Sequence, residues 1–143
     1  MSGKQFVEME LILSAFKESG TASLPVQGRS MRPFLKAGRD RVFLSLPDGN
    51  FRKGDIVVYR RGRAFIMHRI IAVDGDTVSI MGDNETNPDN GVSKESIVAV
   101  VKKAERKGRI ITEKSLVWKF FSSVYIRPRV RGFFLKLHRI RKG

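Results

Sequence analysis

The spacing of apolar residues divides this chain into a helical, a β-rich and a second helical segment. In the first segment, apolar side chains recur at steps of three and four residues: Phe6, Met9, Leu13 and Phe16. Gly20 follows this run and is placed to end a helix. The pattern therefore predicts a short amphipathic helix over residues 4–19.

Between residues 41 and 101, helical spacing gives way to short runs of β-branched residues separated by Gly, Asp and Asn. Such runs are typical of strands, and they predict strands at 41–46, 55–60, 64–73, 77–81 and 96–101. The Asp48-Gly49 and Asp74-Gly75 pairs are predicted hairpin turns. Several short strands with tight turns predict a mainly β fold, in the form of a compact, coiled antiparallel sheet or barrel.

From residue 112 the apolar residues return to helical spacing, in two stripes that Pro128 separates. The first stripe consists of Leu116, Val117, Phe120, Phe121 and Val124, and the second of Val130, Phe133, Phe134, Leu137 and Ile140. Basic residues flank the second stripe: Arg127, Arg129, Arg131, Lys136, Arg139, Arg141 and Lys142. A basic amphipathic helix of this kind can lie in a membrane interface. An apolar stripe that packs on the β core, with its basic face in solvent, explains the pattern equally well.

The net charge of +14 is concentrated near the C-terminus. Residues 1–101 hold 14 Lys/Arg and 12 Asp/Glu, a net of +2, whereas residues 102–143 hold 14 and 2, a net of +12. The basic segment is expected to seek an anionic surface, either lipid head groups or a phosphate backbone. Periodicity and charge together predict three parts, an N-terminal helix (1–20), a β domain (21–111) and a basic helical appendage (112–143).

Composition excludes several kinds of site. The chain has no Cys and only two, widely separated His residues, so we expect no disulfide, no metal site and no cofactor. The sequence has no apolar run of about 18 residues, the length that would predict a transmembrane helix. It also has no basic region followed by an apolar stretch, the pattern that would predict a secretory signal. The expected location is therefore the cytoplasm or the periphery of a membrane.

Ser30 lies in the stretch "VQGRSMRPFLKAG", where an apolar run and Gly28 precede it. Such a sequence brings a strand into a tight turn and leaves backbone amides free to face a ligand, for example an oxyanion. The alternative interpretation is an ordinary turn serine.

A nucleophilic serine needs a base, and His68 is a candidate. It lies in the apolar strand "AFIMHRII", where an imidazole must find hydrogen-bond partners. His68 as a satisfied core histidine is the alternative, and His138 lies in the basic tail.

The loop "MGDNETNPDNG" follows a predicted strand and carries Asp83 and Asp89. A carboxylate near an imidazole holds its tautomer and stabilises the imidazolium that forms when it takes a proton. Aspartates in loops more often form Asx turns, so this loop alone is a weak indication of a site.

The chain carries a series of motifs whose order resembles that in the catalytic domain of type I signal peptidases. The motifs are "GRSMRP", "GD" within "RKGDIVVYRRG", "MHRII", "MGDN" with a further Asp, and "VSKESIVAVV". The chain is also similar to the self-cleaving repressors that share this fold, and the resemblance runs from about residue 26 to residue 101. It implies that Ser30 is the nucleophile and that His68 is the base, since His before Arg marks the Ser/His branch. It further implies Asp89 as the acidic partner of His68, with Asp83 as the second candidate.

The chain departs from that family pattern in two places. Many relatives carry a Ser two positions before the nucleophile that helps to bind the oxyanion, whereas this chain has Gly28, so the amide of Ser30 and a neighbour are expected to stabilise the oxyanion. Family members usually have an N-terminal transmembrane helix, for which the basic C-terminal helices are expected to substitute.

The resemblance implies a serine endopeptidase that cleaves signal or leader peptides, bound extended along a strand edge with small residues before the cut. An unperturbed imidazole titrates near pH 6.5, so activity is expected to rise between about pH 6 and 7. The alternative is a non-catalytic module whose basic tail holds nucleic acid or an anionic membrane. Nucleic acid is disfavoured because the excess charge is confined to the tail and no basic, aromatic-rich strand pattern is present.

Overall fold

A computed structural model describes residues 3–142, with side chains described for residues 8–137. The elements follow one another in this order: α1 (Gly3–Ser19), β1 (Thr21–Pro25), β2 (Arg41–Ser45), β3 (Ile56–Arg61), β4 (Ala64–Asp74), β5 (Thr77–Met81), β6 (Asp89–Ser93), the 3₁₀ turn η1 (Lys94–Ser96), β7 (Ile97–Arg106), β8 (Arg109–Thr112), α2 (Leu116–Lys119), the π-helical turn η2 (Phe120–Val124) and α3 (Pro128–Lys142).

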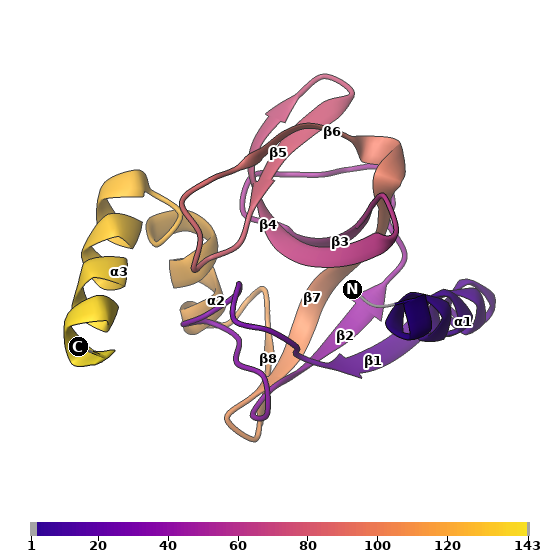
Figure 1. The fold of residues 1–143 in the computed structure, drawn as a ribbon, viewed down its shortest axis with the longest axis horizontal. Helices are drawn as coiled ribbons and strands as arrows, with labels where there is room; N and C mark the ends of the chain where they lie inside the picture. The colour runs from indigo at the N-terminus through magenta and orange to yellow at the C-terminus, as the bar shows by residue number, and fades with distance from the viewer. Residues whose placement is uncertain (1–2, 143) are drawn as a thin grey trace.

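The strands form one antiparallel sheet in the order β1-β2-β7-β3-β4-β5-β6, with β8 paired to β7. The strands from β3 to β6 curl into a partly closed ring above the flatter β1-β2-β7 part (Figure 1). Four register shifts interrupt the ladders, and bulges of this kind allow a sheet to bend. The prediction of a mainly β, coiled antiparallel fold is confirmed.

The hairpin predicted at Asp74-Gly75 is confirmed, because Asp74 pairs with Thr77 across a tight turn. The hairpin predicted at Asp48-Gly49 is wrong. There the backbone N–H of Asn50 donates to Asp48 Oδ1 (2.9 Å), which makes a local Asx turn. The flanking strands β2 and β3 do not pair with each other, since both pair with β7. The turn therefore lies in a connection that crosses over β7.

Two apolar clusters fill the molecule. The larger lies between the sheet and the helices at both ends of the chain, and it includes Phe16 of α1, Phe34, and Trp118 of α2. The smaller lies on the other face of the curled strands and includes Val57, Ile70 and other aliphatic residues. Alternate residues of β4 face these two clusters, because successive side chains of a strand point to opposite faces.

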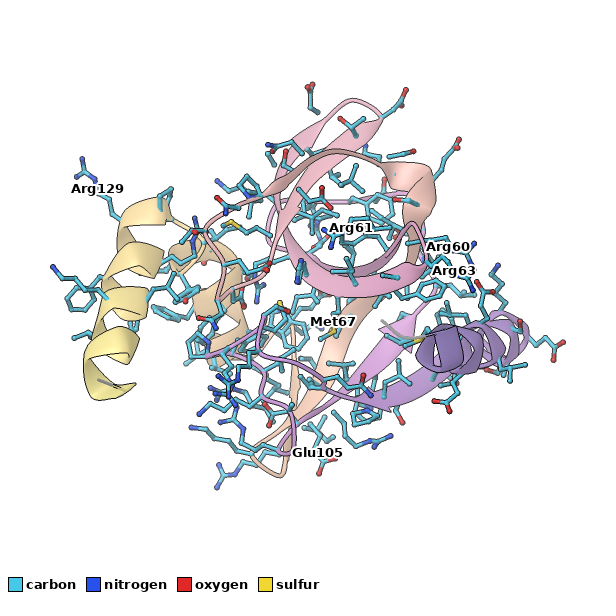
Figure 2. All side chains as sticks on the ribbon, viewed as in Figure 1. Arg60, Arg61, Arg63, Met67, Glu105 and Arg129 are labelled. Atoms are coloured by element: carbon cyan, nitrogen blue, oxygen red, sulfur yellow. The ribbon has the colours of Figure 1, made fainter. Side chains whose placement is uncertain are left out.

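The C-terminal helix α3 packs through aromatic side chains on η2 and on Tyr125, the residue that follows η2. The ring of Phe134 on α3 lies 5.9 Å from the Phe120 ring and 5.7 Å from the Tyr125 ring. Phe133 and Leu137 of the same helix remain exposed, and the Arg129 side chain extends away from the body of the molecule (Figure 2). The second apolar stripe is therefore partly packed and partly exposed. Within residues 3–142, no helix is long and apolar enough to cross a bilayer.

Candidate active site

Ser30 lies in a turn that follows β1 and leads into the core. Gly28, two residues before it, has a φ of 72°, a left-handed conformation that side chains disfavour. The next residue, Met31, is buried in the larger apolar cluster together with Phe34 and Leu35. The turn is thus fixed on its inner side while Ser30 itself remains partly accessible.

The hydroxyl and the backbone N–H of Ser30 make no hydrogen bond to any described residue. An unengaged N–H next to a serine hydroxyl can donate to an oxygen that becomes negatively charged during attack at a carbonyl. Gly28, two residues before Ser30, has no side chain to add a second donor.

The loop between β5 and β6 holds the Ser30 turn from the other side. The backbone N–H of Asn84 donates to the carbonyl oxygen of Ser30 (2.8 Å), and Asn84 Nδ2 donates to the carbonyl oxygen of Arg29 (3.2 Å). A Cβ atom on Gly82 would lie 2.5 Å from the Ser30 carbonyl oxygen and 3.1 Å from Ser30 Cβ. The close approach of loop and turn therefore requires glycine at position 82.

A buried ion pair anchors this loop to the sheet. Arg69 Nε and Nη2 donate to the two carboxylate oxygens of Asp83 at 2.8 and 2.9 Å, and Arg69 Nη1 donates to the Gly54 carbonyl (2.8 Å). The Tyr125 hydroxyl donates to the backbone carbonyl of Asp83 (2.8 Å). Burial is the main reason why the pKa of Tyr125 is raised, so this phenol remains a donor. Asp83 thus holds the shape of the loop through its ion pair with Arg69.

His68 lies on β4 beside this loop, and its side chain is buried. Its Nε2 lies 3.3 Å from Oε1 of Glu85. Burial lowers the pKa of His68, because it disfavours the charged imidazolium, and Arg61 adds to this effect. The nearby carboxylates, Glu85 first among them, oppose it. The imidazole is therefore neutral at pH 7 and can accept a proton.

The carboxylate of Asp89 contacts groups other than His68. The Tyr59 hydroxyl donates to Asp89 Oδ2 (2.9 Å), and Arg61 Nη1 lies 3.3 Å from the same oxygen. Burial, followed by this hydrogen bond, raises the pKa of Tyr59. Across the described side chains, the carboxylate that contacts His68 is Glu85, not Asp89 or Asp83.

Sequence reasoning missed Glu85, although it lies in the same acidic loop. The loop carries several carboxylates, and the sequence does not show which of them turns toward β4. The deciding interactions are local. The backbone N–H of Glu85 donates to the Gly82 carbonyl (3.0 Å), and the Gly82 N–H donates to Glu85 Oε1 (3.0 Å). Glu85 thereby folds back over Gly82, between the Ser30 turn and His68.

Ser30 and His68 line one cavity of about 550 Å³, between α1 and the sheet. Most of its other lining is apolar, including Met9 and Ile12 of α1 and Leu24 of β1. Met67, next to His68 on β4, lies in the middle of the molecule, between the curled strands and the β1-β2 layer (Figure 2). We call this cavity the Ser30 cleft.

The other predicted residues and kinds of site fall outside the Ser30 cleft. Arg127, Arg129 and Lys136 are exposed near or on α3, and Arg131 Nη1 donates to the Ile126 carbonyl (3.3 Å). The side chains of Arg139 and Arg141 lie outside the described residues. The described side chains include no group of three His, Cys, Asp or Glu residues that could hold a metal ion.

Comparison with known proteins relates the chain to a family. Residues 4–105 match the family described as Peptidase S24-like, a range that includes Ser30, His68 and the loop between β5 and β6. The chain is 33% identical to a signal peptidase I of Bacillus amyloliquefaciens over 91 residues, which are 62% of this chain and 49% of that relative. It thus spans about half the length of that curated relative. The extent of the family match, together with the ordered motifs, means that the chain belongs to the Peptidase S24-like family.

Proposed function

We propose that this protein is a serine endopeptidase that removes leader or signal-like peptides. The observation that carries the proposal is the placement of Ser30 and His68 in one apolar cleft, in a chain of a peptidase-like family. The unengaged hydroxyl and N–H of Ser30 support it, because both are needed for attack at a carbonyl.

In the proposed reaction, Ser30 Oγ attacks the scissile carbonyl carbon while the neutral His68 takes the hydroxyl proton. The Ser30 N–H donates to the oxyanion that forms. His68 then gives its proton to the leaving amine, and the C–N bond breaks to leave an acyl group on Ser30. A water molecule, deprotonated by His68, hydrolyses this ester and restores the free serine. Glu85, and to a smaller extent Asp83 and Asp89, stabilise the transient imidazolium through their negative charge.

The substrate class follows from the cleft and from the relatives. A peptide that enters the Ser30 cleft meets aliphatic side chains from α1 and β1, which favour apolar residues near the cut. The Bacillus relative is a signal peptidase, and signal peptides contain such apolar stretches. We therefore propose an extended peptide as substrate, with small residues directly before the cut.

A peptide library tests the proposal. Leader-like peptides of varied sequence are incubated with the wild-type protein and with Ser30→Ala, and mass spectrometry identifies the products. We expect cleavage at sites preceded by small residues with the wild type and none with the variant. Equal cleavage by both proteins, or none by a folded wild type on any peptide, contradicts the proposal.

Gly82→Ala is predicted to lower kcat/KM about a hundredfold, because its Cβ would push the Ser30 carbonyl away from its position. Displacement of a reacting group by about 1 Å can have an effect of this size. Gly132→Ala is the matched control, since Gly132 lies on α3 with no atom within 4 Å of its Cβ position. Peptide cleavage rates measure both, and an unchanged rate for Gly82→Ala would show that the loop does not position Ser30.

The C-terminal helix α3 is proposed to attach the enzyme to an anionic membrane. Arg129, Phe133 and Leu137 follow one another at steps of four and so share one helix face, and Phe133 and Leu137 are exposed. Exposed apolar residues among basic ones are typical of helices in a membrane interface. Deletion of residues 112–143 is unsuited as a test, because Trp118 and Phe121 belong to the core.

Replacement of Arg127, Arg129 and Lys136 by Gln is predicted to weaken binding to phosphatidylglycerol vesicles on the order of a hundredfold, at about 1 kcal/mol for each charge. The matched control replaces the exposed Lys17, Lys53 and Arg109 by Gln. Vesicle co-sedimentation measures both variants. Equal losses in the two variants contradict a role for α3, and tight, salt-sensitive binding to an oligonucleotide without vesicle binding favours nucleic acid as the partner.

A further inference from the structure

A small cavity lies between the turn that carries Ser30, the loop that joins β5 to β6, and α3. Its volume is about 200 Å³, and its lining includes Arg32, Asn84, Tyr125, Phe134 and Leu137. Figure 1 shows α3, which borders this cavity, on the opposite side of the molecule from α1, which borders the Ser30 cleft. The cavity is therefore separate from the Ser30 cleft, and we call it the Arg32 pocket.

Arg32 brings a positive charge to this pocket that no described carboxylate neutralises. Its Nε is buried and has no hydrogen-bond partner, and none of the ion pairs among the described residues includes Arg32. The residues whose side chains are not described, 1–7 and 138–143, include no Asp or Glu. Arg32 as a whole is only partly buried, so a ligand can reach it. A buried donor and a charge without partners are unfavourable, so the pocket favours an anion.

The other charged groups near the pocket do not supply that anion. Those that act on the Tyr125 hydroxyl are Asp83, Arg131 and Arg69. Both oxygens of Asp83 accept hydrogen bonds from Arg69, so these two charges cancel. Arg131 donates to the Ile126 carbonyl, which is a neutral group. The charge that remains around the pocket is therefore positive.

The polar groups of the pocket suit a phosphate. A guanidinium presents its donors as a planar fork that matches the oxygens of phosphates and carboxylates. Asn84 Nδ2 carries two hydrogens and donates one to the Arg29 carbonyl, which leaves the second for a ligand oxygen. The pocket is smaller than the sites of about 300–1,000 Å³ that enclose drug-sized molecules. It therefore fits one charged group and not a whole organic ligand.

An apolar wall connects the pocket with the exposed apolar face of α3. Phe134 and Leu137 line the pocket, and 37% and 41% of their surface is exposed. Leu137 follows the exposed Phe133 by four residues, so the two side chains share a helix face. A ligand with its charged group at Arg32 would place its remaining atoms against these apolar side chains. A phosphate joined to apolar chains, as in a phospholipid, has this composition.

We propose that the Arg32 pocket binds the phosphate of an anionic phospholipid, with the guanidinium of Arg32 on the phosphate oxygens and the apolar part of the lipid along Phe134 and Leu137. The choice of a lipid rests on the proposed attachment of α3 to a membrane. The anion site itself rests on the pocket alone and requires no peptidase activity. The pocket would add a specific contact to the general attraction between the basic residues of α3 and an anionic surface.

Nuclear magnetic resonance of the arginine side chains tests the pocket directly. Arg32→Lys identifies the Nε–H signal of Arg32, because the variant lacks it. Inorganic phosphate is titrated into the full chain, and so is dihexanoyl phosphatidylglycerol below the concentration at which it forms micelles. We expect this signal to shift with both, and the lipid to bind at least about tenfold more tightly, since only the lipid buries apolar surface. Ser30→Ala should respond as the wild type does.

Two variants test the pocket from different sides, with isothermal titration calorimetry as the measurement. Arg32→Gln should weaken the binding of both ligands at least about tenfold, because a charge-assisted hydrogen bond is lost. Leu137→Glu should weaken both as well, because it places a carboxylate at the pocket without altering the turn that carries Ser30. Arg109→Gln removes an exposed charge on β8 and is the matched control, with unchanged affinity.

The outcomes separate the pocket, the lipid and the peptidase function. No shift of the Arg32 signal with either probe, or affinities in Arg32→Gln and Leu137→Glu equal to that of Arg109→Gln, overturns the pocket. Equal affinities for inorganic phosphate and the lipid overturn the lipid as ligand and leave free phosphate in its place. Binding to a protein that cleaves no peptide supports the pocket and counts against the peptidase function, whereas cleavage without binding does the reverse.

Discussion

His68→Gln is expected to lower kcat at least about a thousandfold, because the variant loses the imidazole that lines the Ser30 cleft together with Ser30 and is proposed to take its proton. Glutamine fills a similar volume and can hydrogen-bond to Glu85, but it cannot accept a proton at neutral pH. Initial rates on a cleaved library peptide, with wild type and variant at equal concentration, measure the loss. A His68→Gln variant that retains more than a tenth of the wild-type rate would exclude His68 as the base.

The dependence of the wild-type cleavage rate on pH tests the role of His68 as the base a second time. The reaction needs neutral His68, so the rate rises with pH as the imidazolium loses its proton. Burial lowers the pKa of His68, which places this rise below the unperturbed value of about 6.5. The rate should therefore have reached its plateau by pH 7, earlier than the sequence alone predicts. A rise centred above pH 7 would contradict a buried imidazole as the base.

Asp83→Ala is expected to lower the free energy of unfolding by about 3–5 kcal/mol, the cost of leaving a buried charge without its partner. Arg69 is almost fully buried, and its guanidinium donates twice to Asp83. The remaining contacts of Arg69, to the Gly54 carbonyl and to the Phe34 ring, do not neutralise its charge. The ion pair also ties the loop that holds Ser30, so activity should fall with stability.

Urea unfolding followed by circular dichroism measures this effect, with Glu95→Gln as an exposed control that should change little. A second variant, Arg69→Met with Asp83→Ala, removes both charges and should recover most of the lost stability, since apolar groups replace a buried ion pair at little cost. If Asp83→Ala alone is as stable as Glu95→Gln, the ion pair between Arg69 and Asp83 does not hold the loop.

The β fold could be predicted from the sequence because its longest strands combine β-branched residues with clear turn residues. Two of the strands that were missed, β1 and β6, lack this signal. β6 reads "DNGVS", which is typical of a turn, and it becomes a strand through pairing with β5. β1 contains Pro25 and two exposed hydroxyl residues, and it is held by pairing with β2. Long-range pairing of this kind is not encoded in the local pattern.

The candidate site was predictable to the level of motifs and not to the level of contacts. Ser30 and His68 were proposed because the motifs that contain them occur in an order that resembles type I signal peptidases, since a turn serine or a strand histidine alone has an ordinary structural explanation. Glu85 was missed because the choice among loop carboxylates depends on one backbone hydrogen bond, from the Gly82 N–H. Asp89 instead accepts hydrogen bonds from Tyr59 and Arg61, two residues of β3. Where these two side chains lie relative to Asp89 depends on how the sheet folds.

The central claim is that Ser30 forms a covalent acyl intermediate, and an acyl-transfer measurement tests it most directly. An activated ester of a peptide that ends in a small residue acylates a nucleophilic serine quickly, so the intermediate accumulates before hydrolysis. The mixture is quenched in acid and analysed by mass spectrometry. We predict a mass increase equal to the acyl group on the fragment that contains Ser30, and none in Ser30→Ala. Acylation at another residue that persists in Ser30→Ala, in a protein that cleaves peptides, would contradict the account.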